Sequence, residues 1–105
     1  MATEVIAGHE ISVDDEGFMT DPSEWSEELA EALAKEIHID ELTEVHWKVI
    51  RFLRADHAEA GETATIRRVS MQTGLTTKQL YQLFPKKPAK KMAYISGLPK
   101  PTGCV

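Results

Sequence analysis

The sequence predicts a mainly helical fold, in which a small N-terminal β-hairpin packs on an orthogonal helical bundle with a helix-turn-helix-like core and a flexible C-terminal arm. Three observations support this prediction: apolar residues alternate near the N-terminus, recur at helical spacing through most of the chain, and give way to a Pro- and Gly-rich end. With 105 residues, 42% of them apolar and 28% charged, the chain has the length and composition of one globular domain.

The N-terminal elements are predicted from short local patterns. Residues 4–19 favour a small hairpin with a turn at Gly8-His9, because apolar and polar residues alternate on both sides. A helix is expected over residues 21–36, since an Asp-Pro pair at its start supplies a capping side chain and a proline suited to the first helical position. The longest helix is expected to begin after a Thr43 cap and to end at Gly61.

The C-terminal half is expected to hold three short helices. Two of them fall within residues 65–84 and are separated by Gly74, an arrangement typical of a helix-turn-helix. A third is expected over residues 88–95. The segment after it contains two prolines and two glycines in ten residues and cannot be helical. We therefore expect a helical domain over residues 1–95 and a mobile arm over residues 96–105.

Charge is distributed unevenly along the chain. Residues 1–60 carry four Lys and Arg against sixteen Asp and Glu, a balance of −12, whereas residues 61–105 carry eight against one, a balance of +7. This asymmetry indicates either an anionic partner for the C-terminal half or attraction between the two halves. Arg68 and Lys78 in the helix-turn-helix-like segment are candidate nucleic-acid contacts, although the total charge of −5 makes DNA the less favoured partner.

Several classes of site and protein are excluded by simple counts. One cysteine cannot form an intramolecular disulfide, and no His/Cys cluster has the spacing of a metal site, so neither a metal nor a cofactor is expected. No apolar run approaches the roughly 20 residues needed to cross a bilayer, so membrane insertion is not expected. The acidic N-terminal stretch lacks the features of a secretory signal, which favours a cytoplasmic location.

The single cysteine, Cys104, is the penultimate residue and lies on the Pro/Gly-rich arm. With Gly97 as a hinge, its sulfur would reach on the order of 20 Å from the domain, at roughly 3.3 Å per extended residue. A thiolate at this position could accept sulfur as a persulfide and carry it into another protein, whereas the alternative is an incidental exposed cysteine. The residues expected to shape the arm and dock it on a partner are Gly97, Pro99, Lys100, Pro101 and Gly103.

The C-terminal run Gly-Leu-Pro-Lys-Pro-Thr-Gly-Cys-Val, together with Leu83-Phe84-Pro85 and Trp25, closely resembles the DsrC/TusE family. Its members are the gamma subunit of dissimilatory sulfite reductase and the TusE sulfur-relay protein, and the similarity extends over essentially the whole chain. The resemblance implies a helical domain, an N-terminal hairpin and a mobile arm on which Cys104 carries sulfur. In TusE the sulfur passes toward tRNA thiolation, and in the reductase system the arm presents its cysteine near sirohaem.

One position departs from the two-cysteine pattern of the sulfite reductase carriers. Residue 93, eleven positions before Cys104, is Ala, which favours the single-cysteine, TusE-like form and intermolecular sulfur transfer. The predicted function is a sulfurtransferase-type carrier without a complete active site of its own, working with sulfur-donor and sulfur-acceptor proteins. The alternatives are a regulatory or DNA-binding protein and an accessory gamma subunit of a sulfite-reductase-like complex. The residues expected to bind anionic sulfur or a partner, the last four as a basic cluster at the base of the arm, are Arg67, Lys86, Lys87, Lys90 and Lys91.

Overall fold

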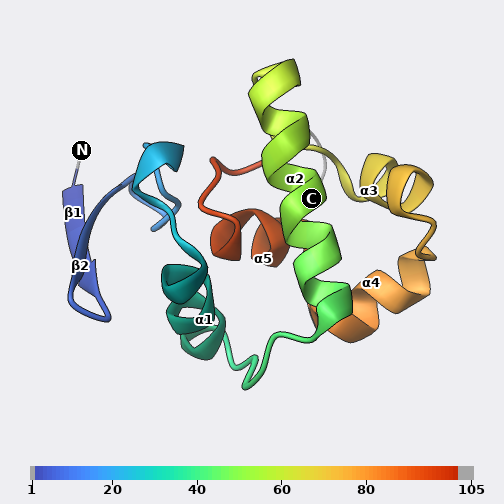
Figure 1. Ribbon diagram of the computed structural model, residues 1–105, viewed down its shortest axis with the longest axis horizontal. Coiled ribbons are helices and arrows are strands. Elements are labelled where there is room, and N and C mark those ends of the chain that lie inside the picture. Colours follow the sequence, from blue (N-terminus) through green and yellow to red (C-terminus); the bar gives the residue numbers. More distant parts are fainter. Residues whose placement is uncertain (1, 102–105) are drawn as a thin grey trace.

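The computed structural model describes residues 2–101, and within them five α-helices form a bundle with a two-stranded hairpin at one end (Figure 1). The predicted fold class is confirmed. In chain order the elements are β1 (Ala2–Ile6), β2 (His9–Val13), the single-turn 3-10 helix η1 (Pro22–Glu24), α1 (Glu27–Glu36), α2 (Glu44–Ala60), α3 (Ile66–Thr73), α4 (Thr77–Leu83) and α5 (Pro88–Ile95).

The hairpin pairs β1 and β2 in antiparallel register, and its turn differs by one residue from the prediction. Ala7 and Gly8 form the turn with φ values of 51° and 81°, and His9 is already the first residue of β2. A two-residue turn with positive φ at both positions matches the twist of the paired strands, which explains why the turn is centred before His9. Ile11 and Val13 on β2 are buried, and β1 packs against α1.

The helix predicted over residues 21–36 is interrupted after its first turn. Asp21 caps as expected, but η1 ends at Trp25, where the backbone becomes extended with φ −75° and ψ 147°. A new helix, α1, then begins with its own cap, because the Ser26 hydroxyl accepts a hydrogen bond from the backbone N–H of Leu29 at 3.1 Å. Because the helix is interrupted at Trp25, the indole of this residue can reach the end of α5, where it binds Ile95.

The predicted caps of the central helices are confirmed. Thr43 caps α2 and Gly61 ends it with φ 78°. Gly74 ends α3 with φ 79°, and Thr76 and Gln79 form a capping box at the start of α4. In each cap, the two bonded residues lie within four positions of each other in the sequence, so local spacing alone is enough to predict such caps.

Helix α5 lies at the centre of the bundle and packs against α1, α2 and α4 (Figure 1). The residues of its inner face, Pro88, Ala89, Met92, Ala93 and Ile95, are buried. None of the helices in residues 2–101 is long and apolar enough to span a membrane. The largest fully buried side chains are Phe84, Ile11, Met19, Leu29, Leu33, Ile50, Leu53, Leu80, Met92, Ile95, Leu98 and Val49.

Candidate functional site

The C-terminal arm is only partly within the described residues. Cys104 and Gly103, the predicted sulfur carrier and its neighbour, lie outside them, whereas residues 96–101 are described. We expected the chain to leave the domain at Ser96 with Gly97 as a hinge. Instead Ser96 is 0% exposed and Leu98 is 1% exposed, so the first residues of the arm belong to the packed domain.

The segment 95–98, which we call the arm root, is bound by two side chains from distant parts of the sequence. The indole Nε1 of Trp25 donates a hydrogen bond to the carbonyl oxygen of Ile95 at 2.8 Å. Arg54 on α2 donates from Nη1 to the carbonyl oxygen of Ser96 at 2.8 Å, and from Nη2 to that of Pro22 at 3.1 Å. The two carbonyl groups that follow the last turn of α5 are thereby satisfied.

Arg54 and Trp25 also contact each other. The Arg54 guanidinium carbon lies 4.1 Å from the centroid of the indole ring, within the range of a cation–π interaction. Burial lowers the pKa of the Arg54 guanidinium from its usual value, but an arginine remains cationic at neutral pH. The arm root is therefore held by one fixed charge that stacks on an aromatic ring and binds two backbone carbonyls.

Gly97 is required at the arm root for two separate reasons. Its φ is +69°, a backbone conformation that side-chain-bearing residues rarely adopt. A Cβ atom at this position would lie 2.5 Å from Cδ1 and 2.8 Å from Cγ of Trp25, far inside van der Waals contact. Gly97 thus permits close packing between the arm and the indole, whereas the sequence had indicated a hinge.

Beyond the root, two further contacts hold the described part of the arm. Thr63, which is 6% exposed, donates from Oγ1 to the carbonyl oxygen of Pro99 at 2.8 Å. The Lys100 ammonium lies 3.1 Å from the carboxylate of Glu16 in the loop after β2. We call these two interactions the outer contacts. The ammonium of Lys100, expected to help dock the arm on a partner, is therefore paired with a carboxylate of the body.

The four lysines at positions 86, 87, 90 and 91 were expected to surround the base of the arm, and the structure corrects this placement. They lie in the loop before α5 and in its first turn, whereas the arm leaves from the opposite end. Eight helical residues separate the ends by about 12 Å. The side chain of Lys91 instead donates to the carbonyl oxygen of Pro85. This group forms a basic surface at the N-terminal end of α5.

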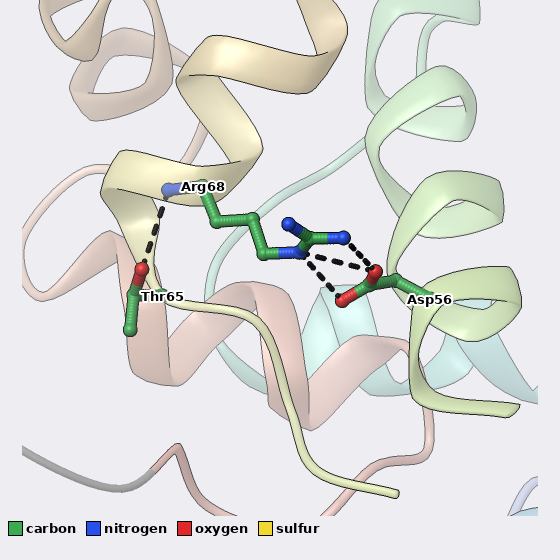
Figure 2. A network of polar contacts seen from close by, with 3 residues as sticks. All are labelled: Asp56, Thr65 and Arg68. Atoms are coloured by element: carbon green, nitrogen blue, oxygen red, sulfur yellow. Dashed lines mark hydrogen bonds and ion pairs between the residues drawn. The ribbon is translucent and has the colours of Figure 1, made fainter. Parts of the chain in front are cut away.

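The helix-turn-helix-like pair α3–α4 carries the two candidate nucleic-acid contacts, and one of them is already bound. Arg68 donates from Nε and Nη2 to both carboxylate oxygens of Asp56 on α2, the shortest bond being 2.6 Å (Figure 2). These bonds hold the pKa of Asp56 below its usual value and raise that of Arg68. Lys78 is exposed on α4, and Arg67 is exposed in the first turn of α3.

A surface cavity of about 390 Å³ lies beside this ion pair and borders the outer contacts. It is lined by residues of α2 and α3 and of the loop between them, including Asp56, Thr63 and Arg68. Thr63 thus both lines the cavity and binds the arm. Within residues 2–101, no group of three or more His, Cys, Asp or Glu is arranged to hold a metal ion.

Sequence reasoning did not identify Arg54 and Thr63 as residues that bind the arm, and it used Trp25 only as part of the family resemblance. Their bonds to the arm join residues 36 to 70 positions apart, and no spacing rule predicts such pairs. One signal was available: Arg54 directly follows the buried Leu53 in α2, where a charged residue needs a buried partner. Ala93, the position of the second cysteine in the two-cysteine pattern, is 0% exposed on α5.

Comparison with known proteins agrees with this arrangement over the whole chain. A family model for DsrC-like proteins matches residues 5–105. The sulfurtransferase TusE of Photorhabdus laumondii is 41% identical over 108 residues, which cover 96% of each chain. The crystal structure of the oxidized gamma-subunit of the dissimilatory sulfite reductase (DsrC) from Archaeoglobus fulgidus superposes with a TM-score of 0.83 at 39% identity, covering 99% of this chain and 100% of that chain.

A solution structure of DsrC from Allochromatium vinosum gives a TM-score of 0.84 at 37% identity over 98% of this chain and 97% of that chain. The similarity therefore includes the hairpin, all five described helices and the arm root. It also agrees with the resemblance carried by the C-terminal sequence run. On these matches, the chain belongs to the family of DsrC-like proteins.

Proposed function

We propose that this protein is a sulfur carrier that accepts sulfur as a persulfide on Cys104 and delivers it to a partner enzyme. The observation that carries the proposal is the full-length similarity to sulfurtransferase TusE at 41% identity, in a chain whose only cysteine is the penultimate residue. A catalytic apparatus in the chain itself is not needed, because the donor and the acceptor supply the other reacting sulfur atoms.

The transfer step balances without an oxidant or a reductant. The Cys104 thiolate attacks the outer sulfur of a donor persulfide, R–S–SH, so that a new S–S bond forms on Cys104 while the donor S–S bond breaks. The products are the Cys104 persulfide and the donor thiolate, and the proton stays on the transferred sulfur. Delivery repeats the exchange with the acceptor as the attacking nucleophile. The thiolate is the reactive form in each step.

We propose different roles for the root of the arm and for the residues after it, on the basis of the contacts of the arm. Residues 1–95 form the body, and within the arm of residues 96–105 we assign the root, up to Leu98, to the packed body. The bonds from Trp25 and Arg54 would then hold the origin of the arm in place when a partner binds Cys104. The residues after the root supply the length that brings the thiol to the partner.

The partners we propose are a persulfide donor and a sulfur acceptor of the kind that serve TusE. The similarity to the DsrC gamma-subunit favours a second candidate, an accessory role beside a sulfite-reductase-like enzyme. The two roles use the same cysteine and differ in the acceptor. Co-purification with a sirohaem protein from the native host would favour the second.

The test is mass spectrometry of the intact protein after incubation with a persulfide donor, for which glutathione persulfide serves. We expect one adduct of about +32 Da, the mass of one sulfur atom, which dithiothreitol removes. Cys104→Ser is the matched control and should carry no adduct. An unmodified wild-type chain, or an adduct that persists in the variant, would overturn the proposal.

A further inference from the structure

We propose that Thr63 and Glu16 are positioning residues for sulfur transfer, because their contacts with Pro99 and Lys100 hold residues 99–101 of the arm on the body until a partner displaces them. This inference rests on the proposed function of Cys104. It divides the described arm into a permanent root and a releasable outer part.

The two parts of the arm differ in the kind of contact that holds them. At the root, the Ser96 carbonyl is bound by a stacked arginine, Gly97 packs against an indole, and Leu98 is 1% exposed in the core. In the outer part, Pro99 is exposed and its carbonyl group accepts the hydrogen bond from Thr63, while Pro101 is buried. Lys100 is bound by an ion pair in which both side chains are partly exposed, at 36% and 51%.

Release of the outer part exposes the buried Pro101 ring, but its polar contacts are weak. When the Thr63–Pro99 hydrogen bond breaks, the Pro99 carbonyl group accepts a hydrogen bond from water instead. A hydrogen bond exchanged in this way contributes little net stability. An exposed ion pair likewise contributes little and is weakened by salt. Release of the root would instead expose a leucine from the core and leave a partly buried guanidinium without its carbonyl partner, which costs more.

The consequence for function is a change in reach. With the outer contacts formed, the last described residue packed on the body is the buried Pro101, and three further residues allow Cys104 roughly 10 Å of extended chain. With these contacts broken, the chain is free from Leu98, and the same length becomes roughly 20 Å. The gain of roughly 10 Å matters for a thiol that must enter an active site in another protein. It also explains why residues far from Cys104 would govern delivery.

The contacts can be removed without changing the core. Thr63→Val keeps the shape of the buried side chain and removes its donor, while Thr63→Ser keeps the donor and is the matched control. Glu16→Gln removes the charge that binds Lys100, and Asp15→Asn removes the same charge one residue away. A thermal melt of each variant establishes that the fold is retained.

The first readout is the position of the arm, measured by NMR with a nitroxide spin label on Cys104, the only thiol in the chain. In wild type we expect the strongest broadening of amide signals around residues 16 and 60–65. Thr63→Val should weaken this broadening and spread it over more of the surface, and Thr63→Ser should restore it. An identical broadening pattern in wild type and Thr63→Val would overturn the inference.

The second readout is the labelling rate of the unmodified thiol by a 5-kDa maleimide polymer, divided by the rate with iodoacetamide. Loss of one hydrogen bond worth about 1 kcal/mol should raise this ratio roughly fivefold in Thr63→Val. Glu16→Gln should raise it less than twofold at physiological salt, and Asp15→Asn should leave it unchanged. Equal ratios in Thr63→Val and Thr63→Ser would contradict the inference. Neither readout uses sulfur, so failure of persulfide loading remains distinguishable from failure of the outer contacts.

Discussion

The arm root and the α3–α4 pair are both candidate functional regions, but they are held in opposite ways. The root depends on bonds between residues far apart in sequence, such as Trp25 with Ile95 and Arg54 with Ser96. Apart from the ion pair of Arg68 with Asp56 on α2, the side-chain hydrogen bonds of the α3–α4 pair join residues a few positions apart, such as the Thr65 hydroxyl with the Arg68 amide and the reciprocal bonds of Thr76 and Gln79. The first region is a built tertiary site, whereas the second is a locally capped unit with exposed cations on its surface.

This difference predicts where a substitution should change the free energy of unfolding most. In the root, a single side chain satisfies two backbone carbonyls and packs on an aromatic ring, so one change removes several interactions. In the α3–α4 pair, the exposed cations Arg67 and Lys78 can be changed without altering the core. The predictions below test this contrast.

The largest effect is expected at Gly97. Gly97→Ala should destabilise the protein by about 2–4 kcal/mol, because the new Cβ both strains a positive φ and overlaps with the indole of Trp25. The matched control is Gly74→Ala, where φ is +79° but no atom lies within 4 Å of the added Cβ. The control should cost about 1 kcal/mol, from strain alone.

Urea unfolding followed by circular dichroism gives both free energies, and their difference isolates the contact with Trp25. A second variant, Trp25→Ala, separates the overlap with the indole from other causes of destabilisation. Trp25→Ala should make the two glycine substitutions nearly equal in cost, because the overlapping ring is then gone. Equal costs in the wild-type background would mean that the root is no more tightly packed than the surface turn at Gly74.

The contrast also explains how much could be predicted from the sequence. The boundaries of α2, α3, α4 and α5 follow from Thr caps, Gly ends and a Pro start, which act within one turn of the helix. The interruption at Trp25 does not follow, because a tertiary hydrogen bond to Ile95 competes with the local preference for one continuous helix. The packed root was missed for the same reason: Pro and Gly indicate an irregular backbone, which is not necessarily an exposed one.

The placement of the lysines shows a related limit. Their nearness to the arm in sequence suggested nearness in space, but α5 intervenes and carries the arm to its other end. Arg68 shows the reverse. Its local pattern indicated a surface cation, whereas Asp56, twelve residues earlier on α2, binds it with both carboxylate oxygens. Charge patterns along a chain therefore identify candidates, and tertiary contacts determine which of them remain available.

An intermediate effect is expected at the Asp56–Arg68 ion pair, and it should depend on pH. Hydrogen bonds from Arg68 lower the pKa of Asp56 in the folded state from the usual value of 3.8. A lowered folded-state pKa contributes stability above the unfolded-state value, and that contribution is lost as the pH falls through the folded-state value. Wild type should therefore exceed Asp56→Asn in stability at pH 7.

The difference between wild type and Asp56→Asn should begin to shrink as the pH falls below the usual value of 3.8 and should continue to shrink through the lowered folded-state pKa of Asp56. Urea unfolding at pH 7, 5, 4 and 3 measures this convergence. Asp40→Asn removes an exposed carboxylate from the loop between α1 and α2 and serves as the control. A constant difference at every pH would mean that the ion pair stabilises the α2–α3 packing by its shape alone.

The smallest effect on stability is expected from Arg67→Gln combined with Lys78→Gln, because both side chains are exposed on the locally capped pair. The free energy of unfolding should change by less than about 0.5 kcal/mol. The same variant tests whether these cations bind nucleic acid. With a net charge of −5 and Arg68 bound to Asp56, wild type should not retard duplex DNA at physiological salt. Retardation that weakens with salt, disappears in the double variant and is unaffected by Cys104→Ala would reverse the contrast, since function would then lie on α3–α4 and the arm root would only complete the fold.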